Sequence, residues 1–153
     1  MRASTCWSLW TAKIATRDFC ILTLFLNCGL RISELVNLNV TDVRDNQLRV
    51  LGKGNKERIL FLNDACVKAI QDWMTDRNAL TLIDQERLFV TLQNRRRISV
   101  AAVHKLVKKH LADAGLDSTQ YSAHKLRHTA ATLMLQKRTW TCVHCRKFWA
   151  TTT

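Results

Sequence analysis

The spacing of apolar residues along the chain predicts a mainly helical protein. Residues 15–28 are apolar on most sides, which predicts a buried helix that Gly29 interrupts. Residues 30–38 resume the helical spacing, either as a second helix or as a kinked continuation of the first. Asp64 can cap a further helix, which runs to about residue 80. The apolar face of that helix consists of Val67, Ile70, Trp73 and Met74.

Two later segments have one apolar and one polar face. A helix from Ser99 that Gly115 ends has an apolar stripe of Val100, Val103, Val107 and Leu111. Three lysines lie off that stripe: Lys105, Lys108 and Lys109. Ser122 can cap a last helix, whose inward-facing residues are Leu126, Ala130 and Leu133. Its other face gathers His124, Arg127 and His128.

One segment alternates with a period of two instead. Residues 47–62 place apolar side chains at alternate positions on both sides of a glycine-rich turn at residues 52–57. This pattern is typical of a β-hairpin. A short apolar run follows at residues 88–92. The predicted fold class is therefore mainly α with a small antiparallel β-sheet.

The charge of the chain favours a polyanionic partner. The 153 residues carry a formal net charge of +12, and lysines or arginines that meet phosphates release condensed counterions. Residues 1–13 and 137–153 contain no acidic residue but four of the five tryptophans. Without these flanks, 18 basic and 12 acidic residues remain, a net charge of +6. We therefore expect one partial domain at residues 14–136 between two atypical flanks.

Composition also limits where the chain acts and what it binds. No apolar run approaches the ~18 residues that cross a bilayer, so we expect a cytoplasmic protein without a membrane partner. The six cysteines are interpreted as thiols. Cys142 and Cys145 have the spacing of half a zinc site, but no second ligand pair lies at a suitable spacing. The sequence predicts no metal.

Three basic elements that lie far apart in the sequence carry the candidate chemistry. Arg31 follows a glycine that breaks a helix, Lys53 lies in the hairpin turn, and a third element starts at His124. A single arginine or a Gly-Lys-Gly turn is more often solvated surface than a site. The third element is more specific, because His124 and Arg127 place an imidazole and a bidentate phosphate ligand on one helical face.

In order, these elements resemble the tyrosine recombinases, most closely those of the Xer type. Residues 28–35 (CGLRISEL) resemble the first arginine box, residues 52–58 (GKGNKER) the hairpin lysine, and residues 124–129 (HKLRHT) the His-x-x-Arg box. The resemblance covers roughly residues 15–136. It implies the tyrosine recombinase catalytic-domain fold, incomplete at its C-terminal end.

The resemblance also implies a reaction. A tyrosine attacks a DNA phosphate, forms a 3′-phosphotyrosyl link and frees a 5′-hydroxyl. Arg31 and Arg127 would neutralise the phosphate oxygens, Lys53 would protonate the leaving oxygen, and His124 would assist proton transfer. No cofactor is needed. The expected partner is double-stranded DNA, on which four subunits would act at two sites.

Several assignments leave alternatives. Lys56 rivals Lys53 as the hairpin lysine, although position in the motif favours Lys53, and His128 suits a structural role beneath the site. We expect DNA contacts from Lys56, Arg58, Lys125 and the lysines at 105, 108 and 109. A charged helix face is also often only solvated, so the three lysines remain open.

The tyrosine nucleophile is missing from the 153 residues. The only tyrosine, Tyr121, precedes His124, whereas the family's nucleophile follows it, so we assign Tyr121 to packing. Read from their third positions, the codons of residues 141–151 permit the missing Leu-Gly-His segment, and residues 5–13 permit a family-like start. We therefore hypothesise a frameshift near Lys137, which also accounts for the isolated cysteines of the tail.

The sequence therefore predicts one function and leaves two alternatives. The sequence predicts a catalytic domain for site-specific DNA recombination and integration that is inactive alone, because nothing in it can form the covalent intermediate. The alternatives are a non-catalytic DNA-binding remnant of an integrase and a decayed gene product. Site preference in DNA binding would favour the remnant, and aggregation would favour decay.

Overall fold

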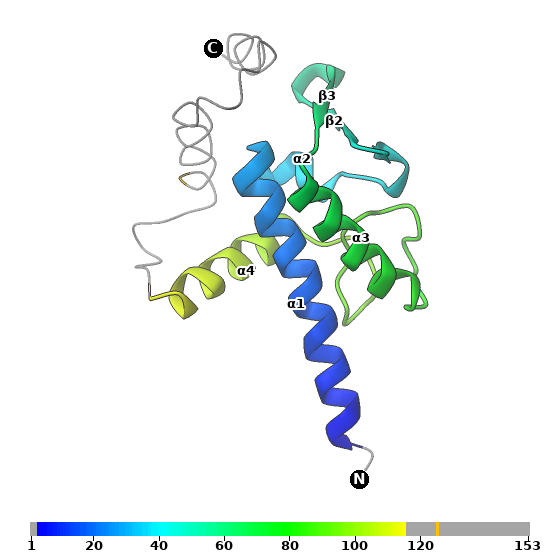
Figure 1. Cartoon of the computed structure of the whole chain (residues 1–153), viewed down its shortest axis with the longest axis vertical. Helices are drawn as coiled ribbons and strands as arrows, with labels where there is room; N and C mark the ends of the chain where they lie inside the picture. The colour runs from blue at the N-terminus through cyan, green and yellow to red at the C-terminus, as the bar shows by residue number, and fades with distance from the viewer. Residues whose placement is uncertain (1–2, 116–124, 126–153) are drawn as a thin grey trace.

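Figure 1 shows the computed structural model of the chain, which describes residues 3–115 and residue 125. Its α-helices are α1 (Ala3–Cys28), α2 (Ile32–Val36), α3 (Asp64–Asn78) and α4 (Val100–Asp113). Its strands are β1 (Val43–Arg44), β2 (Gln47–Leu51) and β3 (Glu57–Phe61). Two short 3-10 turns lie at Val40–Asp42 and Lys53–Asn55. The predicted class, mainly helical with a small antiparallel sheet, is confirmed.

Helix α1 is the central element of the fold, and α3 packs along it (Figure 1). The helix begins at Ala3, well before the predicted start at residue 15. Five of its side chains are buried in the core: Cys20, Ile21, Leu24, Phe25 and Cys28. The hydroxyl of Thr16 donates to Asp76 of α3 at 2.6 Å, which adds a polar contact to the apolar helix pair.

Gly29 ends α1 as predicted. Its φ of 58° lies in the left-handed region, which glycine adopts without the steric cost of a Cβ. After this turn, Leu30 is buried and Arg31 caps the N-terminus of α2. The second helix is therefore separate from the first rather than a kinked continuation.

The predicted hairpin forms from β2 and β3, which pair in antiparallel register from Gln47 opposite Phe61 to Leu51 opposite Glu57. Leu48 and Val50 point into the core, whereas Ile59 and Phe61 lie on the exposed face. Strand β1, which no sequence pattern predicted, pairs with β2 at the edge of the sheet. The strand order is therefore β1-β2-β3, and the turn projects beyond the helices (Figure 1).

Helix α3 confirms the predicted helix, with one change at its N-terminus. The capping residue is Asn63, whose side chain accepts from the Cys66 amide at 2.9 Å, and Asp64 is the first helical residue. A carboxylate at that position still stabilises the positive end of the helix dipole. Trp73 is fully buried and donates its indole N–H to the Leu88 carbonyl at 2.9 Å.

Helix α4 confirms the predicted helix after Ser99, whose hydroxyl accepts from the Ala102 amide at 3.1 Å. The predicted stripe was wrong at Val100, which is 42% exposed, whereas Leu106 is buried. The first helical residue therefore lies outside the core, and Leu106 joins Val103 and Val107 on the buried face. Gly115 follows the helix with a φ of 75°.

Residues 79–99 connect α3 to α4 and complete the core without a regular strand. Leu88, Phe89, Val90 and Leu92 of the apolar run are buried. A single bridge joins the segment to the residues after α2, from Arg87 to Asn39, and a second bridge lies within it, from Val90 to Arg97. Within the described part of the chain, no helix is long and apolar enough to cross a membrane.

Candidate functional site

Arg31 occupies the N-terminal cap of α2. Its backbone is extended, with φ of −76° and ψ of 149°, and its amide donates to Glu34 Oε2 at 2.8 Å. A glutamate three residues into a helix often satisfies the cap amide in this way. The Arg31 side chain also donates from Nη1 to Glu34 Oε1 at 3.2 Å and stays 38% exposed.

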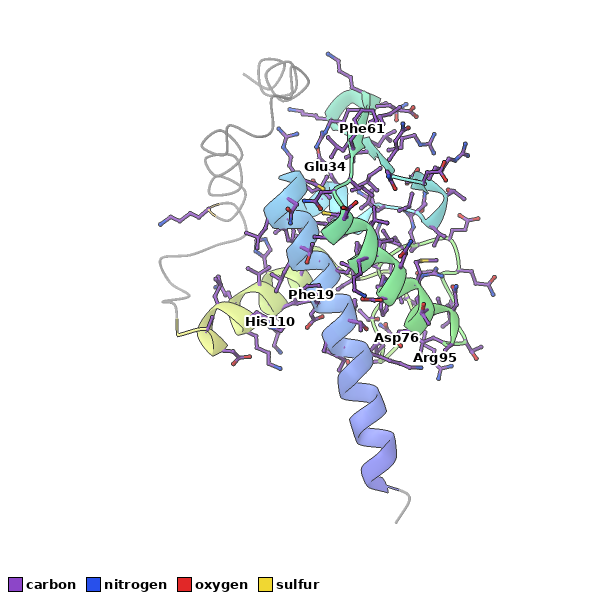
Figure 2. All side chains as sticks on the ribbon, in the orientation of Figure 1. Phe19, Glu34, Phe61, Asp76, Arg95 and His110 are labelled. Atoms are coloured by element: carbon purple, nitrogen blue, oxygen red, sulfur yellow. The ribbon has the colours of Figure 1, made fainter. Side chains whose placement is uncertain are left out.

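Glu34 is the centre of the site. Its side chain is only 4% exposed, and its two oxygens accept two parallel hydrogen bonds from Arg58 of β3, each 2.8 Å long. Figure 2 labels Glu34 between the end of α1 and the base of the hairpin. The carboxylate therefore joins two elements that lie 24 residues apart, α2 and β3.

The pKa of Glu34 is held below its ordinary value. Burial acts to raise this pKa, but hydrogen bonds from the Arg58 side chain and the Arg31 amide, together with the charges of both arginines, lower it further than burial raises it. Glu34 is therefore ionised at neutral pH. The two guanidiniums and one carboxylate leave the cluster with a net charge of +1.

The hairpin turn extends from this ion cluster toward solvent. Lys53 and Lys56 are both exposed, and the turn between them contains Gly54 with a φ of 75°. Gly52 closes the base of the turn, because its amide donates to the Lys56 carbonyl at 2.8 Å. A Cβ on Gly52 would lie 3.5 Å from Arg58 Nη1 and 3.8 Å from Glu34 Oε1. Gly52, the residue before Lys53, thus lies against the ion pair of Glu34 and Arg58.

The structure accordingly brings together two of the three sequence elements singled out above. Arg31 and the hairpin that carries Lys53 meet at Glu34. A half-exposed guanidinium can bind an anion such as a phosphate, to which arginine offers two parallel hydrogen bonds. His124 and Arg127, the third element, lie outside the described residues, as do His128 and Tyr121.

The remaining predicted DNA contacts lie on the surface. Lys105, Lys108 and Lys109 are exposed on one face of α4, and Lys125 is exposed as well. Arg58 differs, since both of its terminal nitrogens are directed to Glu34. The sequence motif contained this residue but gave no sign of its partner.

Helix α4 is held against α1 by a second buried carboxylate. Asp18 is 5% exposed and accepts from Arg17 at 2.7 and 3.0 Å. His110 of α4 lies on its other oxygen, with 3.0 Å between Nε2 and Oδ2 (Figure 2). Helix α4 also contacts α2, the helix that follows Arg31.

Cysteines near the site are buried thiols rather than ligands. Cys28 and Cys66 lie 4.0 Å apart at Sγ, and Cys20 is fully buried in the same core. Burial raises the pKa of the Cys20 thiol. Across the described residues, no three histidine, cysteine or acidic side chains lie together as a metal site would require.

Comparison with known proteins gives a family match. The model of the phage integrase family matches residues 5–140. Tyrosine recombinase XerC of Caldanaerobacter subterraneus subsp. tengcongensis is 56% identical over 118 residues, which are 77% of this chain and 33% of that protein. XerC of Alcanivorax borkumensis is 40% identical over 126 residues, covering 80% of this chain and 40% of that protein. The chain thus spans between a third and two fifths of these two relatives.

Solved structures agree with the sequence relatives. The crystal structure of XerA recombinase matches 90% of this chain and 51% of that one, with a TM-score of 0.73 and 27% identity. XerH recombinase in a post-cleavage complex with a palindromic difH substrate matches 83% of this chain and 37% of that one, with a TM-score of 0.70 and 26% identity. The resemblance to Xer-type recombinases found in the sequence is confirmed.

Proposed function

Because the chain belongs to the phage integrase family, we propose that residues 14–136 form part of a tyrosine recombinase catalytic domain that acts in site-specific DNA recombination. One observation carries the proposal beyond family membership. The half-exposed Arg31 and the hairpin that carries Lys53 meet at one ionised carboxylate, Glu34. This arrangement supports a site in which Arg31 binds a phosphate and the neighbouring hairpin supplies a proton donor.

Each group has a chemical task in this proposal. Arg31 binds the non-bridging oxygens of a DNA phosphate, whose charge the guanidinium stabilises during transfer. Lys53 protonates the leaving oxygen from the exposed turn, with Lys56 as its rival for that task. His124 and Arg127 complete the phosphate site from the segment beyond α4, as the motif implies. No cofactor takes part.

The proposed partner is double-stranded DNA, and the relative XerH is solved with a DNA substrate. Lys56, Lys125 and the α4 lysines would contact the backbone. The motif also makes Arg58 a candidate DNA contact, although both of its terminal nitrogens donate to Glu34. The family resemblance implies a tetramer on two DNA sites, and we also propose a cytoplasmic location.

The proposal separates binding from cleavage. Tyr121, the only tyrosine of the 153 residues, precedes His124, so these residues by themselves lack a nucleophile in the family's position. We propose that the flanks 1–13 and 137–153 are out of the family's frame, and resequencing of the locus tests this. An uninterrupted frame through the present codons, with no nearby insertion or deletion in relatives, would contradict it.

A nicked duplex tests the proposed function directly. We expect the chain to bind it with an affinity that falls with salt, and Arg31→Gln to weaken binding about tenfold, the effect of about 1.4 kcal/mol. No covalent adduct should survive detergent. Lys68→Gln is the control, because Lys68 is exposed on α3 and pairs with Asp72. Unchanged binding by Arg31→Gln would contradict the phosphate site, and a detergent-resistant adduct would contradict the missing nucleophile.

A further inference from the structure

Arg58 is committed to the buried carboxylate of Glu34. Its Nη1 and Nη2 each donate at 2.8 Å, to Oε1 and Oε2 respectively, and its side chain is 22% exposed. Two parallel charge-assisted hydrogen bonds form the strongest arrangement of an arginine with a carboxylate. A guanidinium held in this way is poorly placed to turn toward a separate phosphate.

The same carboxylate holds Arg31 much less tightly. The Arg31 side chain makes one hydrogen bond to Glu34, 3.2 Å long, and is more exposed than that of Arg58. Because Arg58 satisfies both carboxylate oxygens, the charge of Glu34 is already balanced. The net charge of +1 that remains in the cluster is therefore carried on the exposed side, at Arg31.

The ion pair also fixes the base of the hairpin. Arg58 lies opposite Val50 in the β2–β3 register. It follows two residues after Lys56, whose carbonyl accepts from the Gly52 amide at the base of the turn. The Gly52 backbone packs on the pair, where an added Cβ would lie 3.5 Å from Arg58 Nη1. The start of the Lys53 turn is thus supported by the arginine that balances Glu34.

We infer that Arg58 is a positioning residue. It neutralises Glu34, keeps the Arg31 guanidinium available to a DNA phosphate, and holds the base of the Lys53 turn against α2. The inference rests on the proposed function, because it takes a DNA phosphate as the ligand of Arg31. Without Arg58, the buried carboxylate draws Arg31 into a bidentate pair, since a buried charge without a partner is strongly unfavourable. Arg31 is then withdrawn from DNA.

A rescue experiment tests this role. Equilibrium binding of the full chain to a fluorescein-labelled DNA duplex is measured for Arg58→Gln and for the double variant Arg58→Gln with Glu34→Gln. We expect Arg58→Gln to weaken binding about tenfold and the double variant to return to within about threefold of the unmodified chain. Removing the carboxylate frees Arg31 again. A direct contact of Arg58 with DNA would give no such rescue.

Two further variants show whether weaker binding results from a loss of structure. Arg58→Lys retains the charge but cannot satisfy both oxygens, so we expect a loss of about threefold, again restored by Glu34→Gln. Lys68→Gln should bind as the unmodified chain does, because Lys68 is exposed and distant in sequence from the cluster. Circular dichroism shows whether each variant is folded. If Arg58→Gln is unfolded, the comparison of Arg58→Lys with and without Glu34→Gln decides the test.

The results separate a failure of the positioning role of Arg58 from a failure of the proposed DNA site. If the double variant binds as weakly as Arg58→Gln, or if neither Arg58 variant weakens binding, the positioning role is wrong while the DNA site stands. If the unmodified chain shows no salt-dependent binding, or if Arg31→Gln binds as well as the unmodified chain, the proposed function fails and the inference fails with it.

Discussion

Among single residues, Glu34 holds the site together, because its carboxylate accepts hydrogen bonds from both Arg31 and Arg58. Breaking a buried ion pair leaves an unpaired charge, so Glu34→Gln should lower the free energy of unfolding by about 3 kcal/mol in urea titrations. Glu57→Gln is the matched control, since Glu57 is 54% exposed and lies 3.6 Å from Arg49. Its loss should stay below about 1 kcal/mol. Equal losses in the two variants would contradict the role of Glu34.

The lowered pKa of Glu34 adds a pH dependence to that prediction. Between the folded and unfolded pKa values, the unfolded chain binds more protons at this residue than the folded chain. The stability contributed by Glu34 is therefore complete above its ordinary pKa of 4.5 and is lost as the pH falls through the lower folded value. The difference between the unmodified chain and Glu34→Gln should shrink over that acidic range.

The sequence predicted two residues of the candidate site but not the ion pair that joins them. Arg31 and Lys53 were found because each lies in a short motif that can be recognised locally. The pairing of Glu34 with Arg58 was not found, because it joins residues 24 positions apart and depends on how the hairpin folds onto α2. The spacing of Glu34 three residues after Arg31 was the one local sign, typical of a helix cap.

At the scale of elements, the position of α4 depends on His110. Its Nε2 lies 3.0 Å from buried Asp18 of α1, so His110→Ala should lower the free energy of unfolding by about 1 kcal/mol. His104→Ala is the control, because His104 is exposed on the same helix. Its effect should stay within about 0.5 kcal/mol. A larger loss from His104→Ala than from His110→Ala would contradict this anchor.

Helices and the hairpin were predicted better than their ends. Periodicity found α3, α4 and the β2–β3 pair because each buries one face. It placed Val100 in the core, since a stripe cannot show where the supporting surface stops. It missed β1, because two residues are too few to show alternation. Residues 79–99 contact Trp73 and Asn39, which lie far from them in the sequence, so no local pattern predicts their fold.

At the scale of the whole molecule, the net charge of +12 predicts salt-dependent binding to DNA. If Lys105, Lys108 and Lys109 contact phosphates, replacing all three by glutamine should reduce the slope of log affinity against log salt by about 2.7, at about 0.9 per contact. Lys68→Gln, on α3, should leave the slope unchanged. An unchanged slope in the triple variant would mean that the α4 face is merely solvated.

Arg31 and the Lys53 turn are proposed to form a DNA phosphate site around Glu34. Chemical-shift mapping by NMR, with a duplex titrated into the isotope-labelled chain, tests it most directly. We predict that signals of Arg31, Gly52 and Gly54 shift at low salt and return as salt is raised, whereas those of Lys68 and Asp72 on α3 stay in place. Shifts confined to other surfaces, with Arg31 and the turn unchanged, would contradict the claim.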